Sequence, residues 1–226
     1  MAPINELDRF RRVWEVEAQL TTKLLESLPA DQYDFRPDRG GRSLGEMAWH
    51  LAEIEGYISY GIVNGAVTFQ QAPPNMQRPR EVRLLAPGYQ RVHADSETRL
   101  VKLAEADLDR EIAFADRRMP IRDILWGAIL MHLVHHRGQL SLMCRMAGGT
   151  PPGIYGPNRE EMAAMQERMQ AAKVSNDISR DVLTGAPPRR ACSRSTSGRR
   201  SAAIPDSRCS VSRDTPPRPW PMPPNR

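Results

Sequence analysis

Cysteine is scarce in this sequence, and its spacing argues against two kinds of protein. The chain of 226 residues has three cysteines, Cys144, Cys192 and Cys209, and no two of them form a C-x-x-C pair. Disulfide scaffolds and small zinc domains show closely spaced, repeated cysteines. The sequence therefore gives no sign of a disulfide framework and is typical of a protein from a reducing compartment.

Long uninterrupted apolar runs are also missing. Residues 1–12 contain no apolar core of the kind that a secretory signal requires. The longest apolar stretch, from about Ile121 to Ala147, is interrupted by histidines, and its uninterrupted parts are too short to span a bilayer. From these absences we expect a soluble cytoplasmic protein without a membrane segment.

Acidic residues are sparse at the C-terminal end, so the positive net charge of the chain comes from that end alone. Residues 184–226 contain nine Arg, two Asp and no Lys, a net charge of +7, which leaves −2 of the total +5 for residues 1–183. The near-neutral remainder gives no electrostatic basis for specific nucleic-acid binding. The same tail holds nine of the 20 prolines and few aliphatic residues. We therefore predict a disordered, solvated segment over residues 174–226, after a folded domain over residues 1–173.

What is present is helical periodicity. Apolar residues at intervals of three and four predict helices over residues 4–28, 43–63, 87–108, 120–147 and 159–173. No convincing strand pair appears, and we expect only short extended contacts at Phe114 and Met119. Four long amphipathic helices indicate an all-α four-helix bundle, with the fifth helix as a C-terminal addition. The methionines of that fifth helix are expected to pack; they are Met162, Met165 and Met169.

Histidines mark the candidate functional site. His132 and His136 are four residues apart, so they lie on one face of their helix, and both rings can reach a single metal ion. His50 lies on the apolar face of the second predicted helix. Residue spacing alone leaves two interpretations open, a shared metal site and hydrogen-bonded core histidines. We expect His93, among charged neighbours, to be a surface residue without a role.

Two segments carry a resemblance to a known family. Residues 43–51 read Ser-Leu-Gly-Glu-Met-Ala-Trp-His-Leu, and residues 132–140 read His-Leu-Val-His-His-Arg-Gly-Gln-Leu. Together they resemble the DinB/YfiT-like family of metal-binding four-helix proteins, whose pattern is one His early in helix two and H-x-x-x-H-R-x-Q-L late in the bundle. The connection at residues 28–37 and the turn at 148–152 are similar as well. The resemblance covers roughly residues 4–172, and residues 173–226 have no counterpart in the pattern.

The resemblance implies a divalent metal held by His50, His132 and His136. Pairing of His132 with His135 is also geometrically allowed, but the family pattern selects His136. Three neutral imidazoles leave an open coordination position, which is the arrangement of catalytic rather than structural zinc sites. Zinc suits three histidines best, while nickel, iron and manganese stay open.

Other residues near the motifs are weaker candidates. Glu46 and Glu53 could orient His50 or act as a base, although solvated helix carboxylates are the simpler interpretation of both. Gln139 could hydrogen-bond a metal-bound water. Arg137 is a candidate cofactor contact at the pocket rim, or a surface salt bridge. Cys144 is expected to be a buried structural residue.

Two classes of function follow from the resemblance. The first is a metal-dependent enzyme, either a hydrolase or a transferase of a low-molecular-weight thiol, as in relatives that use bacillithiol or mycothiol, acting on a small-molecule substrate. The second is a non-catalytic metal-binding stress-response protein, in which the metal stabilises the bundle. A closed site with a fourth protein ligand would favour the second class. Pairing of two bundles into a homodimer is a further expectation.

Overall fold

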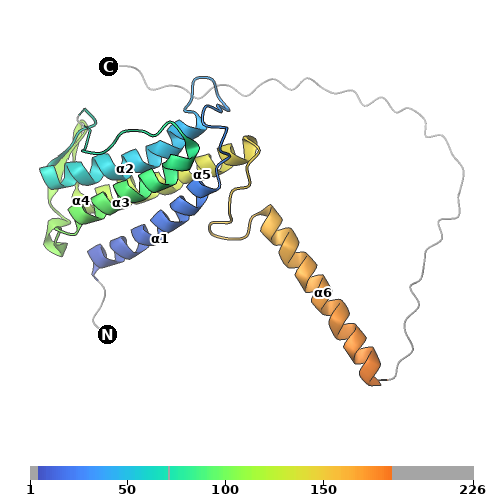
Figure 1. The fold of residues 1–226 in the computed structure, drawn as a ribbon. Helices are drawn as coiled ribbons and strands as arrows, with labels where there is room; N and C mark the ends of the chain where they lie inside the picture. The colour runs from blue at the N-terminus through green and yellow to red at the C-terminus, as the bar shows by residue number, and fades with distance from the viewer. Residues whose placement is uncertain (1–4, 71, 185–226) are drawn as a thin grey trace, which may run out of the picture. The chain divides into compact units, whose positions relative to one another are not determined.

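The chain folds as a helical bundle in which four helical runs lie side by side (Figure 1). The computed structural model describes residues 5–70 and 72–184, with side chains as far as residue 175. The bundle helices are α1 (Glu6–Glu26), α2 (Leu44–Asn64), α3 (Leu85–Leu100) and a continuous run made of α4 (Ile121–Asp123), η3 (Ile124–Met131) and α5 (His132–Met146). The predicted all-α four-helix bundle is confirmed.

The start of α2 follows directly from its sequence. The Ser43 hydroxyl accepts a hydrogen bond from the Glu46 backbone N–H, and the Glu46 carboxylate accepts one from the Ser43 backbone N–H. This reciprocal pair satisfies two backbone donors that the first turn leaves without helical partners. The helix ends at Gly65, whose φ of 81° is a conformation that favours glycine. Both ends confirm the sequence prediction.

The third helix ends earlier than its apolar pattern predicts. We expected it to continue to Leu108, but α3 stops at Leu100, and Val101, predicted to face inward, is 64% exposed. The chain turns there and forms the short 3-10 helix η2 (Glu105–Asp107). The Glu105 carboxylate accepts hydrogen bonds from the backbone N–H groups of Glu6 and Leu7, both at 3.0 Å. This long-range cap on α1 requires the chain to leave the helix, and no local pattern encodes it.

The fold also contains a small three-stranded sheet at one end of the bundle (Figure 1), although we expected no strand pair. Strand β1 (Ala66–Val67) pairs in parallel with β2 (Glu111–Phe114), and β2 pairs with β3 (Arg117–Pro120) as an antiparallel hairpin. The expected extended contacts at Phe114 and Met119 are part of this hairpin. The prediction failed because each strand is very short, so period-2 alternation has too few residues to appear.

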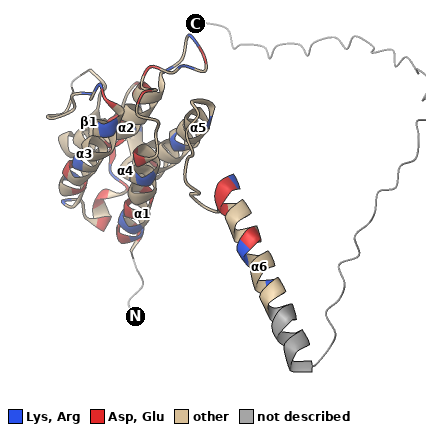
Figure 2. Cartoon of the chain, turned by 45° about the vertical axis from the view of Figure 1, so that its right-hand side comes forward, with Lys and Arg blue, Asp and Glu red and all other residues tan. Residues whose placement is uncertain are grey.

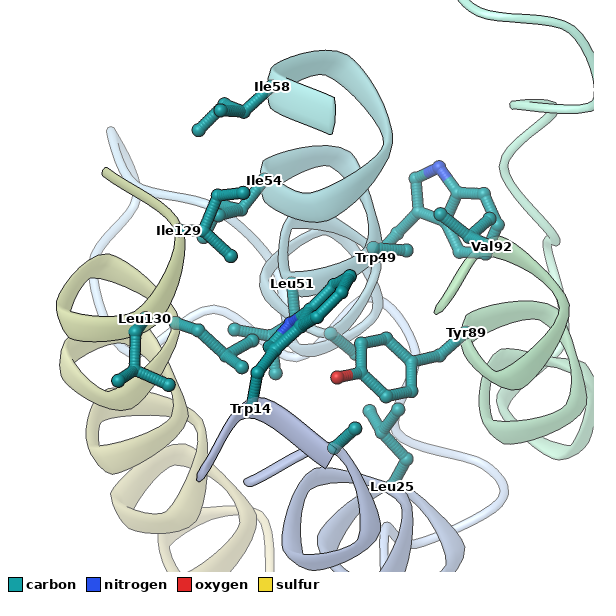
Figure 3. Packing of buried hydrophobic residues seen from close by; sticks show 14 of the residues in the cluster. Trp14, Leu25, Trp49, Leu51, Ile54, Ile58, Tyr89, Val92, Ile129 and Leu130 are labelled. Carbon is teal, nitrogen blue, oxygen red and sulfur yellow. The ribbon is translucent and has the colours of Figure 1, made fainter. Parts of the chain in front are cut away.

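The core is built by large apolar side chains from all four helical runs. Figure 3 shows Trp14 of α1 and Tyr89 of α3 in the middle of the cluster, with Trp49 of α2 on one side and Ile129 of η3 on the other. Each of these four side chains is at most 1% exposed. Such burial is the dominant stabilising contribution in a bundle of this size. It also fixes α2 against the helical run that carries the histidine pair.

The last helix, α6 (Arg159–Thr184), differs from its prediction in two ways. It continues past the expected end at residue 173, and its methionines do not pack. The exposed fractions of Met162, Met165 and Met169 are 41%, 53% and 54%. Charged residues of both signs occur along its described part and along α1 (Figure 2). The rest of the predicted disordered segment, residues 185–226, lies outside the described residues.

No helix in the described part of the chain has the length and apolar character needed to cross a membrane.

Candidate metal centre

Two neighbouring helices supply the three histidines of the candidate site. His50 is in the second turn of α2, whose position the Ser43 cap determines. His132 and His136 are in the first two turns of α5, and α2 packs directly against α5. The helical run changes character just before the pair, because η3 is π-helical and the His132 N–H donates to the Gly127 carbonyl, five residues back. Such π segments are frequent at functional sites.

The three imidazole rings converge on one point. The Nε2 atoms of His132 and His136 are 2.9 Å apart. The ring centroid of His50 lies 5.5 Å from that of His132 and 4.8 Å from that of His136. One ring nitrogen from each residue can be chosen so that all three lie within 4.8 Å of one another. The structure thus brings together the three residues that the sequence motifs selected.

Two polar side chains orient the rings from outside. Oε2 of Glu53 lies 3.2 Å from Nδ1 of His50, one helical turn away. Oε1 of Gln139 lies 2.7 Å from Nδ1 of His136. An acceptor at Nδ1 holds the proton there and leaves the Nε2 lone pair facing the cluster. Glu53 and Gln139 therefore occupy positions from which they set the direction of two rings.

The cluster environment favours neutral rings. Burial, followed by the charge of His50, lowers the pKa of His132. Burial also lowers the pKa of His136, to about 4, and the neighbouring imidazoles add to that effect against the opposing hydrogen bond from Gln139. Near neutral pH both rings are therefore unprotonated, which is the form that can ligate a metal.

The donor set fits a divalent metal ion. Two nitrogens bound to one zinc at a tetrahedral angle are roughly 3.3 Å apart, given Zn–N bonds of about 2.0–2.1 Å. The 2.9 Å between the Nε2 atoms of His132 and His136 is close to that value. Within the described residues, no fourth His, Cys, Asp or Glu lies within 4.8 Å of all three members. The arrangement is that of an open three-histidine site.

Other residues near the motifs have different partners. His135 is exposed, and its Nε2 lies 3.1 Å from Nε2 of Gln139, so it contacts the cluster only from outside. The Glu46 carboxylate caps α2, as its capping-box position predicts, and pairs with Arg36 at 2.8 Å, so its partners lie away from His50. Cys144 is fully buried, with its Sγ 3.7 Å from the Ser27 carbonyl oxygen, which confirms a structural position.

Arg137 does not reach the pocket, and the expectation of a surface or rim contact is wrong. Its side chain is 1% exposed and forms an ion pair with Glu17 of α1. Its Nη1 also donates to the Glu17 carbonyl at 2.9 Å, and the Tyr155 hydroxyl donates to the Glu17 carboxylate at 2.7 Å. Residue 137 follows His136 and therefore points to another face of α5, toward α1. The spacing of the motif indicated this, but an Arg side chain is rarely buried.

A cavity opens beside the cluster. Its volume is about 700 Å³, within the usual range for small-molecule sites. His50, His132 and Glu53 form part of its wall, and apolar side chains from α2 and the β2–β3 hairpin form much of the remainder. The histidine cluster is therefore next to a space that a small molecule can enter.

His93 is the residue that sequence reasoning misjudged most. It is 7% exposed, and its Nδ1 lies 2.7 Å from the fully buried carboxylate of Glu55. Trp14 Nε1 and the Tyr89 hydroxyl donate to the other oxygen of Glu55, at 3.0 and 2.6 Å. Burial by itself lowers the pKa of an imidazole, but the hydrogen bond and charge of Glu55, followed by Glu15, raise the pKa of His93 to about 9.

A second set of side chains in the described residues has the spacing of metal ligands, and the positive charge of His93 explains why they lie close together. Glu15, His93 and Glu97 also offer ligand atoms within 4.8 Å of one another. The Nε2 atom of His93 lies 3.2 Å from Glu15 and 3.9 Å from Glu97. Both ring nitrogens thus face carboxylates, which a protonated imidazole satisfies by donating from each side. The group is therefore an ion network at the edge of the core: His93 of α3 is buried, whereas the side chains of Glu15 of α1 and Glu97 of α3 are 45% and 48% exposed.

The bundle and its histidine cluster define a class of helical proteins with a candidate metal centre between two helices. The DinB family model matches residues 4–170, and the chain belongs to the DinB family. It is 34% identical over 158 residues to YrdA of Bacillus subtilis strain 168, a match that covers 70% of this chain and 92% of YrdA.

Solved structures of the family share the fold. A DinB-like protein from Bacillus cereus ATCC 10987 superposes with a TM-score of 0.54 at 28% identity, over 65% of this chain and 95% of that one. The DinB-like protein YjoA from Bacillus subtilis gives a TM-score of 0.53 at 25% identity, over 67% of this chain and 99% of YjoA. The resemblance expected from the two histidine motifs is confirmed.

Proposed function

We propose that this protein is a metal-dependent enzyme that holds one divalent ion, most suitably zinc, on His50, His132 and His136. The observation that carries the proposal is the convergence of three imidazole nitrogens beside a cavity of about 700 Å³, which the rings of His50 and His132 line. A structural zinc site normally has four protein ligands. A three-ligand group beside a cavity leaves a coordination position for a water or a substrate atom.

The reaction classes that suit such a site are hydrolysis and transfer of a low-molecular-weight thiol. When bound, a divalent ion lowers the pKa of a coordinated water or thiol, which supplies a nucleophile near neutral pH. Three neutral ligands leave the full charge of the ion available for this effect. In neither class does the chain need a cysteine nucleophile, which agrees with the burial of Cys144.

The chain itself contributes orientation and a dry surrounding. Glu53 and Gln139 hold the Nδ1 protons of His50 and His136, so that both Nε2 lone pairs face the same point. Glu53 also lines the cavity, from which it can accept a proton of a bound molecule. The buried apolar side chains of Ile54 and Ile58 keep water from one wall. Exclusion of water strengthens electrostatic interactions inside the site.

The experiment is an activity screen on the full-length protein reconstituted with zinc, nickel or manganese. We expect hydrolysis of an activated ester or amide, or transfer of a small thiol to an electrophile, to depend on the metal. His132→Ala should abolish turnover, whereas the exposed and distant Glu26→Gln should leave it unchanged. Metal-loaded protein without turnover in both screens would instead support a non-catalytic metal-binding protein.

A further inference from the structure

The cavity beside the histidine cluster has an unusually aromatic wall. Tyr57 of α2, Phe114 of β2 and Phe69, which follows β1, all line it. The ring centroid of Phe69 lies 6.2 Å from those of Tyr57 and Phe114. The planes of Tyr57 and Phe69 are tilted by 37° and those of Phe69 and Phe114 by 85°, so a planar aromatic group among them can meet one ring face to face and another edge to face.

Phe69 is the informative member of this surface. Its side chain is 57% exposed, although it contacts two other aromatic rings. A bound molecule can therefore reach this ring from the cavity. Tyr57 and Phe114 are partly buried beneath it. The β2–β3 hairpin and the turn after β1 bring these rings to the cavity from distant parts of the sequence. The sheet therefore adds apolar side chains to the part of the cavity wall that α2 does not form.

The charged side chains of the cavity determine which charge is favoured on a bound molecule. Arg42 and Arg117 line it, and within residues 5–70 and 72–175 neither guanidinium group forms an ion pair or hydrogen bond. Of the two carboxylates, Glu53 is engaged with His50, which leaves Asp123. With a divalent ion on the histidines, the cavity is positive overall. An anionic group on a bound molecule is favoured by such a field.

We propose that the cavity binds a small-molecule substrate with a planar aromatic body and an anionic donor group. The body lies against Tyr57, Phe69 and Phe114, and the donor group faces the histidine cluster. This inference rests on the proposed function, because the donor group needs the metal as its partner. It names the substrate class by two chemical features, and each can be varied separately.

The test is a binding titration of the full-length zinc-loaded protein with three probes. Acetohydroxamate has the donor group without the body, 2-naphthamide has the body without an anionic donor, and 2-naphthohydroxamate has both. We expect 2-naphthohydroxamate to bind at least about tenfold more tightly than either of the others, given the apolar area of two fused rings. Zinc content is measured after each titration, to confirm that the probe has not removed the ion.

Two variants assign the effect to the aromatic wall. Phe69→Ala should remove most of the advantage of 2-naphthohydroxamate and leave acetohydroxamate binding unchanged. Val16→Ala, at a similarly exposed apolar residue on α1, is the matched control and should change neither. Gly127→Leu tests the same point by filling the cavity. Gly127 lines the cavity, and a Cβ at this position meets no atom within 4 Å, so the leucine side chain can occupy the cavity space. It should weaken 2-naphthohydroxamate selectively.

The outcomes separate this inference from the proposal on which it rests. If acetohydroxamate binds with zinc but 2-naphthohydroxamate is no tighter, the substrate class is wrong and the metal site stands. If the advantage of 2-naphthohydroxamate persists in Phe69→Ala and Gly127→Leu, the aromatic body binds elsewhere and the inference is overturned. If the protein holds no zinc, both proposals fail.

Discussion

Single side chains decide which way the candidate ligands point. A histidine can coordinate through either ring nitrogen, and the hydrogen bond at the other nitrogen makes the choice. Glu53 and Gln139 perform this task for His50 and His136, each from a position three residues further along the same helix. Gln139 is thus part of the second histidine motif, whereas Glu53 lies two residues beyond the end of the first.

Glu53→Gln tests this role at the residue scale. The amide oxygen is a weaker acceptor than a carboxylate, so the His50 ring should be held less firmly. We expect metal affinity to fall by about tenfold or more, the effect usual for such outer partners. Competition with a chelator of known affinity measures the change, with Glu26→Gln as the matched control. Unchanged affinity would show that packing alone orients His50.

His93 gives the fold a pH dependence that does not involve the metal centre. Its pKa is raised from 6.5 to about 9 in the folded protein, where it faces Glu55, Glu15 and Glu97. A raised pKa in the folded state means that the stabilisation is fully present below about pH 6.5 and is lost as pH rises through about 9. The size of the effect is on the order of 3 kcal/mol.

Denaturant unfolding at several pH values between about 6 and 10 measures this contribution. The free energy of unfolding of the wild type should fall across that interval. His93→Gln should be less stable at the acidic end and show a flatter profile, so that the two curves approach each other at high pH. Parallel curves would mean that folding does not raise the pKa of His93.

At the residue scale, sequence reasoning succeeded where a motif fixed the geometry and failed where a partner was distant. His132 and His136 meet because helical spacing demands it. His93 looked like a surface residue because its own helix is polar around it. Its partner Glu55 lies on α2, and nothing local to His93 signals a buried carboxylate there. A buried Glu on the apolar face of α2 was the available hint.

Whole elements are held in register by one buried ion pair. Arg137 of α5 and Glu17 of α1 are both largely hidden from water, with 1% and 11% of their side chains exposed. Removing one partner of such a pair leaves a buried charge unpaired. Arg137→Met should therefore reduce the free energy of unfolding by roughly 3–5 kcal/mol.

Thermal and denaturant unfolding of three variants checks this estimate. The double variant Glu17→Leu/Arg137→Met should recover most of the loss, since no unpaired charge remains. Arg159→Met, in which an 81% exposed arginine loses its surface ion pair, should cost less than about 1 kcal/mol. A double variant as unstable as Arg137→Met alone would show that the pair contributes through shape rather than charge.

The helices differ in how well their ends and their helical form could be predicted from the sequence. Helix α2 was predictable at both ends, because its capping box and its terminal glycine are local signals. The end of α3 was not, because Glu105 leaves the helical path to cap α1. The π-helical segment η3 was also missed, since an apolar run of this kind has the same composition in either helical form.

The molecule as a whole combines the helical bundle of its family with a cavity that a small sheet helps to form. Membership of the DinB family explains the arrangement of the helices and the positions of both histidine motifs. The aromatic wall of the cavity combines Tyr57 of α2 with Phe69 and Phe114, which the short strands β1 and β2 bring to the cavity and which sequence patterns did not reveal. The candidate metal centre could thus be located from the sequence, whereas the cavity beside it could only be found once the hairpin was placed against α2.

The most direct test of the central claim is the metal content of the purified full-length protein. Elemental analysis should find about one divalent ion per chain. His50→Ala and the pair His132→Ala/His136→Ala should lose it while keeping the helical circular dichroism of the wild type. A wild-type chain that stays metal-free after incubation with zinc, nickel and manganese would contradict the account. The three histidines would then be core residues of the bundle.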